Sequence, residues 1–539
     1  MKFRSVLSFF FILSLSRIVS GQYYDTGQDP ANLKWLQIKT GRFRVIYPEK
    51  YGAQGIEFAR SLDRAYSDLG SIFPESKFRL PVVIHNFTTE ANGYVAWAPK
   101  RMEIYPTPEQ NSIPLDANRQ LALHELTHVY QMESLNKGFT KAMSFILGQQ
   151  FTGIVASLLP LWYLEGDAVF AETVLSESGR GRSAGFQKYL KAIAIENGEP
   201  FKYDKMIQSS YRDFIPDHYH FGYQMVAWSR LNDLQIWNKT LNYTANKPFT
   251  INPVNLSLRK NADLTKKKLY DQTFDTLKTL WQQDISRSGS IAYEALNPPK
   301  YKQFADYYSP VVVGTDTVIA IKTSLSSLPV FVLIRLSNKT EKKLHVPGYI
   351  HPYSISCAGG KLIWVEMRND PRWENRDYSV IKIMDIRNGG VRQLSHRSRY
   401  MAAAISPDGK YIAASENSVE NKNSLVLLSS EDGSRLKNIP APVNASLQKP
   451  QWSNDGGKIT FIYLTEAGEG ILSYGLNDEK WEILITAGRD DLQSSFLRND
   501  SLFFVTSANG TDNVYLLDPD KKLVQVTNSR FGVNDLSIS

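Results

Sequence analysis

The second half of the chain contains an internal repeat, which constrains the fold more than any other feature. Stretches such as Pro407-Asp-Gly-Lys410-Tyr-Ile-Ala and Asp455-Gly-Gly-Lys458-Ile-Thr-Phe recur in register. The equivalent positions 317, 361, 410, 458 and 501 are 44, 49, 48 and 43 residues apart. Most of these stretches are followed by a strand pair around a tight turn, so each repeat holds about four strands. This spacing is typical of β-propeller blades.

The repeat also sets the expected boundaries. A Pro-rich linker at residues 297–301 precedes a propeller over residues 302–539, in which five blades are visible. Residues 530–538 look like the first strand of a further blade, similar to residues 399–405. Either this strand closes the ring against the first blade, or the sequence is a fragment of a longer chain, which we favour. The form Ser406-Pro-Asp-Gly-Lys410 resembles the repeats of TolB-like and dipeptidyl-peptidase-type propellers.

The first half carries a metal-binding motif, His124-Glu125-Leu-Thr-His128, in an apolar, helix-forming context. Residues four apart on a helix lie within about 40° of one another, so the two histidines can hold one ion. Glu125 lies about 100° round the helix, where it can take a proton from water at that ion. The chain has eight histidines, so we expect this pattern by chance in about one such chain in a hundred.

An open catalytic zinc site normally takes three ligands from the protein. The best third candidate is Glu165, which lies 37 positions beyond His128 in Leu161-Trp-Tyr-Leu-Glu165-Gly. Glu172 follows two helical turns later on the same face, where it could orient a ligand histidine. The alternative for Glu165 alone is an acid at the start of a helix. With the upstream motif, we expect one Zn²⁺ per chain.

These two motifs together, His-Glu-x-x-His and Trp-Tyr-Leu-Glu-Gly-x-Ala-x-x-x-Glu, resemble the gluzincin metallopeptidases, the group containing thermolysin and the aminopeptidase N type. The resemblance implies zinc on His124, His128 and Glu165, with Glu125 as general base. It also implies a peptidase MA-like α+β domain, which we assign to residues 22–296. The fold class expected for the whole chain is therefore multidomain: a gluzincin-like α+β domain followed by an all-β propeller.

The resemblance also implies a tyrosine, downstream of the third ligand, that stabilises the oxyanion. Tyr219 is the best match, with Tyr223 and His220 as nearby substitutes and a packed core tyrosine as the alternative. Arg180 and Arg182 lie on a glycine-rich loop and could clamp a substrate carboxylate. A solvated basic turn is the alternative for this loop. Tyr223 and the two arginines are therefore candidate substrate-binding residues.

The region upstream of the motif departs from the aminopeptidases in one respect. They carry a Gly-x-Met-Glu-Asn strand that anchors the free amine of the substrate, whereas the comparable residues 92–98 contain no acid. We therefore favour an endopeptidase. Strands are expected at residues 43–47 and 80–85, a helix at 53–69, and a hairpin at 93–105 whose edge could bind an extended peptide. Asp116 is the expected N-cap of the motif helix.

Export is predicted by the amino terminus, which has the basic start, apolar core and small residues of a secretory signal over residues 1–21. The single cysteine, Cys357, allows neither a disulfide framework nor a lipid-anchoring cysteine, which favours the periplasm or cell envelope of a bacterium. Eight Asn-x-Ser/Thr sequences are potential N-glycosylation acceptors and would instead favour a eukaryotic secreted protein, although composition explains most of them.

The charge of the chain bears on two further classes of partner, nucleic acid and membrane. The net charge of +8, and the lack of a basic run with interleaved aromatics, indicate that nucleic acid is not a partner. Residues 142–164 contain no charged residue, a length that would allow a membrane span, but polar residues and Pro160 interrupt them. We expect a buried helix or a flap over the substrate cleft, with membrane contact as the alternative and no clear transmembrane segment.

The predicted function is that of an exported zinc metallopeptidase acting on protein or peptide. The propeller would recognise or gate the substrate, or bind an envelope protein partner. The contrary hypothesis is a cell-envelope scaffold in which the propeller binds partners and the metal site is structural or vestigial. A nucleophile elbow of the Gly-x-Ser-x-Gly type is not found beside the propeller, which argues against a serine peptidase.

Overall fold

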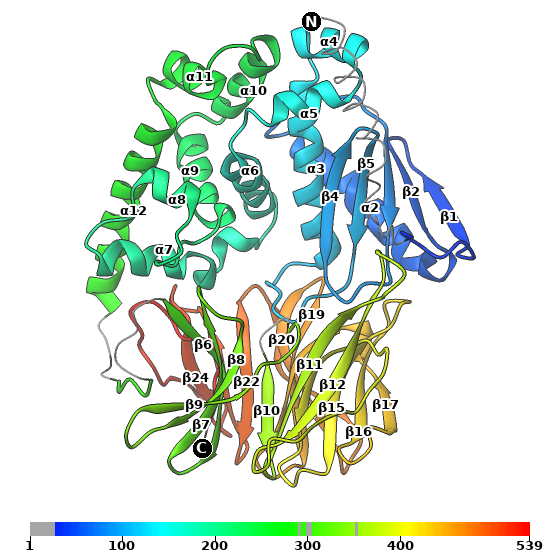
Figure 1. Ribbon diagram of the computed structural model, residues 1–539, viewed down its shortest axis with the longest axis vertical. Coiled ribbons are helices and arrows are strands. Elements are labelled where there is room, and N and C mark those ends of the chain that lie inside the picture. Colours follow the sequence, from blue (N-terminus) through cyan, green and yellow to red (C-terminus); the bar gives the residue numbers. More distant parts are fainter. Residues whose placement is uncertain (1–26, 289–290, 292, 298–303, 351–353, 539) are drawn as a thin grey trace, which may run out of the picture.

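The computed structural model describes residues 27–288, 291, 293–297, 304–350 and 354–538 (Figure 1). The expected signal peptide and residues 298–301 of the expected linker lie outside these ranges. A helical region with a small sheet occupies the upper part of Figure 1, and a β-propeller occupies the lower part.

A five-stranded mixed sheet begins the first region, with strand order β1-β2-β3-β5-β4. β2 pairs parallel with β3 and β3 parallel with β5, whereas β4 and β5 form an antiparallel hairpin that leaves β4 at the edge. The expected strands, hairpin and helix are confirmed. The bounds are β1 (Trp35–Lys39), β2 (Phe43–Pro48), α2 (Gly52–Leu69), β3 (Leu80–Ile84), β4 (Asn92–Trp97) and β5 (Lys100–Tyr105).

Helices make up the rest of this region. The motif helix, α3, begins after Asp116, whose carboxylate accepts a hydrogen bond from the Arg119 amide at 2.9 Å, which confirms the predicted N-cap. The bounds are α3 (Ala117–Leu135), α4 (Gly138–Leu147), α5 (Gln150–Ala156), α6 (Leu161–Val174), η2 (Arg180–Arg182), α7 (Ala184–Glu196), α8 (Tyr203–Gln208), α9 (His218–Asn232), α10 (Ile236–Asn246), α11 (Pro253–Ala262) and α12 (Lys266–Ser288).

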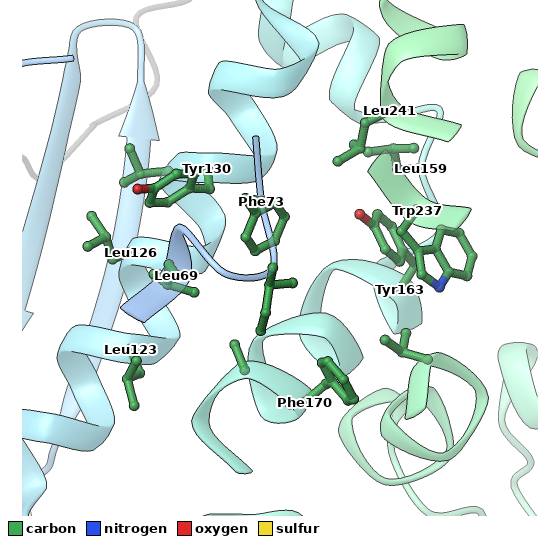
Figure 2. Close-up of a cluster of buried hydrophobic side chains, with 14 of the residues drawn as sticks. Leu69, Phe73, Leu123, Leu126, Tyr130, Leu159, Tyr163, Phe170, Trp237 and Leu241 are labelled. Carbon is green, nitrogen blue, oxygen red and sulfur yellow. The ribbon is translucent and has the colours of Figure 1, made fainter. Parts of the chain in front are cut away.

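The core of the helical region is aromatic and ties the motif helix to its neighbours. Tyr163 of α6 stacks on Trp237 of α10 with ring centroids 4.0 Å apart, and Phe73 stacks on Tyr130 of α3 (Figure 2). These rings are buried within one continuous cluster. Aromatic pairs of this kind stabilise beyond the area that they bury. The cluster therefore holds α3 and α6 in a fixed relation.

Residues 142–164 depart from the expected buried helix. They form the end of α4, all of α5 and the start of α6, and the α4 side chains of Phe145 and Ile146 are exposed. Gly148 interrupts the run at a φ of 87°, a backbone conformation that ends α4. The prediction of a buried helix was therefore wrong, because a lack of charge does not by itself show what covers a segment, whereas the alternative of a flap over the substrate cleft stays a prediction.

Five four-stranded antiparallel sheets form the propeller, each built from consecutive strands. The repeated positions found in the sequence are the first residue of the second strand in four sheets and the residue just before it in the third, which confirms five blades. The strands are β6 (Ala305–Gly314), β7 (Thr317–Ser324), β8 (Val330–Arg335), β9 (Thr340–His345), β10 (Ile355–Ala358), β11 (Lys361–Asn369), β12 (Asp377–Asp385), β13 (Val391–Gln393), β14 (Tyr400–Ile405), β15 (Tyr411–Asn417), β16 (Asn423–Ser429), β17 (Arg435–Pro440), β18 (Ser446–Trp452), β19 (Lys458–Thr465), β20 (Gly468–Gly475), β21 (Trp481–Gly488), β22 (Leu492–Arg498), β23 (Ser501–Thr506), β24 (Asn513–Leu517) and β25 (Leu523–Gln525).

The expected strand of a further blade is not formed, since residues 530–538 contain no strand. They run instead between the last blade and the first. The Leu536 amide donates to Ser494 Oγ of β22 at 3.4 Å, and Asp535 accepts from the Ser309 amide of β6 at 2.7 Å.

Polar contacts join the propeller to the helical region. Ser183 Oγ donates to Asp491 at 2.6 Å, and Ser112 Oγ donates to Glu469 at 2.8 Å. A cavity of about 740 Å³ lies between the two regions. Its lining comes from the η2–α7 segment and residues 111–113 on one side, and from the inner strands of the blades on the other.

Candidate metal centre

Two helices bring the three predicted ligands together. His124 and His128 lie on one face of α3, and Glu165 lies in the first turns of α6, which packs against it. Glu165 Oε2 is 3.2 Å from His124 Nε2 and 3.3 Å from His128 Nε2. The ligand atoms of the three residues all lie within 4.8 Å of one another, a grouping suited to one ion.

The orientation of His128 shows which atom it would offer to a metal. Its Nδ1 lies 3.0 Å from Gln131 Oε1, and the Gln131 amide nitrogen donates to the Leu164 carbonyl at 3.0 Å. Because that amide oxygen can only accept, the ring proton is assigned to Nδ1. The lone pair of Nε2 then faces the Glu165 carboxylate, so a cation, either a proton or a metal ion, has to lie between them.

The electrostatics of this pair agree with that geometry. Burial opposes the charged form of His128, but hydrogen bonding and the charge of Glu165 raise its pKa to about 9. Burial likewise opposes ionisation of Glu165, but hydrogen bonds to both histidines hold its pKa well below the usual range. A site that draws in a positive charge this strongly fits a divalent metal and its His-His-Glu donors.

Glu125, the predicted base, is buried between α3 and the edge strand β4. One carboxylate oxygen, Oε2, has no hydrogen-bond partner in the described structure. Gly93 of β4 lies against the same side chain, and a Cβ at that position would come within 2.6 Å of Glu125 Oε1. The carboxylate is therefore held beside the sheet edge with one oxygen left free for a proton.

The far side of His124 faces an ion pair whose carboxylate is buried. Arg180 of η2 donates through Nε to Glu172 at 2.6 Å, and its Nη2 lies 2.8 Å from His124 Nδ1. Glu172 Oε2 is 3.6 Å from the same ring nitrogen. Burial opposes ionisation of Glu172, but the Arg180 charge lowers its pKa to about 2. The pair packs behind His124, where Glu172 was expected.

The two loop arginines differ in their surroundings. Arg180 contacts His124 and also lines the cavity beside the propeller, so it connects the two. Arg182 donates to the backbone carbonyls of Ser178 and Thr173, both at 3.1 Å, which holds the loop in place. The structure brings Arg180 to the centre, whereas the bonds of Arg182 point back into its own loop.

Tyr219 lies in the first turn of α9, next to the ligands. Its ring centroid is 6.1 Å from that of His124, and the Arg180 guanidinium lies 5.2 Å from it. Burial, the Glu165 charge and hydrogen bonding to Glu165 raise the pKa of the Tyr219 hydroxyl, which keeps it protonated. His220 instead pairs with Asp217 at 2.6 Å, and Tyr223 packs against Gly181.

Three contributors, Gln131, Asp167 and Arg230, escaped the sequence reasoning. Gln131 orients His128, and its own amide also lies 3.3 Å from Asp167 Oδ2. Asp167 in turn pairs with Arg230 of α9 at 2.7 Å, with both side chains fully buried. The position of Gln131, three residues beyond His128 on a helix, was a usable signal for such a partner. Arg230 carried no comparable signal, because it meets Asp167 through tertiary packing.

The fold and the site together define a protein of two parts: a helical region that contains a candidate metal centre, and a five-bladed propeller. No family model matches the chain, and no curated protein matches it. Among solved structures, the chain is similar to TolB from Acinetobacter baumannii, at 14% identity and a TM-score of 0.35, over 43% of this chain and 57% of that one.

Two solved structures of Pyrococcus proteins show a similar degree of likeness. The β-propeller domain of the Trilobed protease from Pyrococcus furiosus has 13% identity and a TM-score of 0.30, over 44% of this chain and 87% of that one. Pyrococcus horikoshii acylaminoacyl peptidase has 13% identity and a TM-score of 0.31, over 42% of this chain and 39% of that one. These likenesses concern the fold alone.

Proposed function

We propose that this chain is an exported, zinc-dependent metallopeptidase that hydrolyses peptide bonds within a polypeptide. The observation that carries the proposal is the convergence of three ligand atoms within 4.8 Å of one another, beside a buried carboxylate with a free oxygen. The gluzincin resemblance of the two motifs supports the same assignment. The signal-like amino terminus supports export to a bacterial periplasm or cell envelope.

The residues have distinct roles in this proposal. Zinc, when held by His124, His128 and Glu165, supplies a Lewis acid that activates water and polarises a carbonyl group. Glu125 accepts a proton from the attacking water and passes it to the leaving amine. The Tyr219 hydroxyl, which its raised pKa keeps protonated, donates a hydrogen bond to the developing oxyanion.

The edge strand β4 is the proposed place for an extended substrate. It ends the sheet on the side of Glu125, so a peptide that added to it would run past the base. Residues Asn92–Trp97 contain no acidic side chain that would bind a free amine. This composition supports cleavage inside a chain over removal of its first residue.

The propeller is proposed to recognise or admit the substrate. The cavity between the two regions, about 740 Å³, is within the range of sites that hold small ligands or short peptides. Arg180 lines this cavity and touches His124, so a group bound there would lie near the metal centre. Arg180 is accordingly the proposed contact for a substrate carboxylate, and an envelope protein partner would bind elsewhere on the propeller.

Glu125→Gln tests the proposal. The purified variant should keep one zinc per chain, measured by atomic emission, and lose cleavage of an unbiased peptide library by about a thousandfold or more, because the base is removed. Glu133→Gln makes the same change on the same helix, where Glu133 pairs with Lys100, and should cleave like the wild type.

Two outcomes would decide against the peptidase. If the wild type holds zinc and cleaves nothing in the library, the scaffold hypothesis with a structural metal replaces it. If His124→Ala retains a full equivalent of zinc, the ligand assignment itself is wrong.

A further inference from the structure

The end of the molecule opposite the propeller carries a group of exposed apolar side chains. Phe145 and Ile146 of α4 are 82% and 75% exposed, and Phe249 and Ile251, in the loop between α10 and α11, are 75% and 93% exposed. Ile154 of α5 is exposed beside them. We call these five residues the apolar tip. Large exposed apolar groups of this kind mark an interaction site.

The apolar tip is one continuous structure, although its two segments are about 100 residues apart. Phe249 contacts Phe139 of α4 and Phe151 of α5, with ring centroids 5.5 and 6.5 Å apart. The Thr140 hydroxyl donates to the Ala245 carbonyl of α10 at 2.7 Å. In Figure 1, α4, α10 and α11 lie together at the end of the molecule farthest from the propeller.

Basic side chains predominate around the apolar tip. Residues 134–164 and 234–262, which build this end, contain six basic residues and no acidic residue, although Glu133, Asp233 and Asp263 border these ranges and Lys239 pairs with Asp233. Exposed apolar side chains beside a net basic surface complement a bilayer surface with anionic head groups. A second copy of the chain is disfavoured as the occupant, because pairing two tips would bring their lysines together.

The tip is built to touch a bilayer and not to cross it. Among the described residues no single helix is long and apolar enough to span a membrane. Only by length and composition, α5 and α6 taken together would be sufficient, and they are bent by 93° at the break between them. However, α6 is buried in the protein core and carries Glu165. Lipid can therefore reach α4, α5 and the loop, whereas α6 belongs to the folded interior.

We propose that the apolar tip docks the protein on an anionic lipid bilayer. Phe145, Ile146 and Ile251 enter the boundary between head groups and acyl chains, while Lys137 and Lys141 lie at the level of the head groups. His128 precedes the end of α3 by seven residues, so the candidate metal centre lies about 10 Å along the helix axis from the end of α3 that leads into α4. The inference does not depend on the proposed catalysis.

Co-sedimentation of the purified exported chain with vesicles tests this inference. Vesicles of phosphatidylcholine and phosphatidylglycerol, at a ratio of about three to one, should bind it, and pure phosphatidylcholine should bind it less. Phe145→Ser with Ile146→Ser should lower the partition coefficient about tenfold or more. Lys137→Gln with Lys141→Gln should remove most of the preference for the anionic vesicles.

The matched control is Ile483→Ser with Leu523→Ser, which changes two exposed apolar residues of the propeller and should leave binding unchanged. Equal melting temperatures of all variants, followed by circular dichroism, show that each is folded. The inference is overturned if the wild type does not bind either vesicle, or if the Phe145 and Ile146 changes leave binding intact. Tip-dependent self-association without vesicle binding would also overturn it, in favour of a second copy.

Discussion

At the scale of single residues, the candidate centre depends on side chains that orient the ligands as much as on the ligands. Gln131 has its amide nitrogen committed to the Leu164 carbonyl, so its oxygen is available to His128 Nδ1. On the far side of His124, the Glu172 carboxylate lies 3.6 Å from Nδ1 and Arg180, which can only donate, holds that carboxylate in place. Partners of this kind fix ring orientation and raise the affinity of a site for its metal.

Gln131→Met should weaken zinc binding by about 10- to 100-fold, because His128 loses the acceptor that holds its ring. The measurement is a competition titration against a chromophoric zinc chelator. Gln120→Met, a similar change on the same helix, serves as the control and should bind zinc like the wild type. An unchanged zinc affinity in the Gln131 variant would show that packing alone orients the ring.

At the scale of elements, the centre depends on how closely α6 and α9 cross. Gly166 of α6 and Gly222 of α9 face each other, and a Cβ on Gly166 would come within 2.3 Å of the Gly222 carbonyl carbon. A Cβ on Gly222 would meet the Trp162 carbonyl oxygen at 2.1 Å. The two glycines allow backbone contact, which brings Tyr219 on α9 up to Glu165 on α6.

Gly166→Ala should lower the free energy of unfolding by about 3 kcal/mol or more, because the clash is with backbone that cannot rotate away. Thermal unfolding followed by circular dichroism measures the loss, and zinc affinity should fall with it as the helices separate. Gly153→Ala on α5 meets no atom within 4 Å and should cost nothing. Equal melting temperatures for the two variants would contradict the proposed crossing.

At the scale of the whole molecule, the contact between the helical region and the propeller contains buried carboxylates. Asp512 of the fifth blade is almost fully buried near Lys188 of α7, and burial together with the Asp491 charge raises its pKa to about 6. Burial also raises the pKa of Glu469, to about 8, at the Ser112 contact. The interface therefore becomes less stable as these groups lose their protons.

Asp512→Asn should raise the melting temperature near pH 8 and have little effect near pH 4. The folded protein holds the Asp512 proton more tightly than the unfolded chain, so stability falls as the pH rises from about 4 to about 6. The gain at high pH should be on the order of 1–3 kcal/mol. Asp500→Asn, on an exposed turn, is the control, and an equal gain at both pH values would refute the assignment.

Much of the fold was predictable from local patterns. The five blades follow from the repeat because consecutive strands pair with one another, so the spacing of turns already contains the topology. The His124–His128 pair also follows from a local pattern, because residues four apart lie on one face of a helix. The expected strand at residues 530–538 did not form, since its place between the last and first blades depends on how the ring closes.

The sequence by itself determined the chemistry of the centre and the number of blades, because both depend on residues near one another in the chain. The tertiary structure alone decided that Arg230 pairs with Asp167, how Arg180 links the centre to the interdomain cavity, and which apolar residues stay exposed. Burial of residues 142–164 could not be predicted from their composition. It depends on whether another element covers them, and that is a property of packing between segments far apart in the chain.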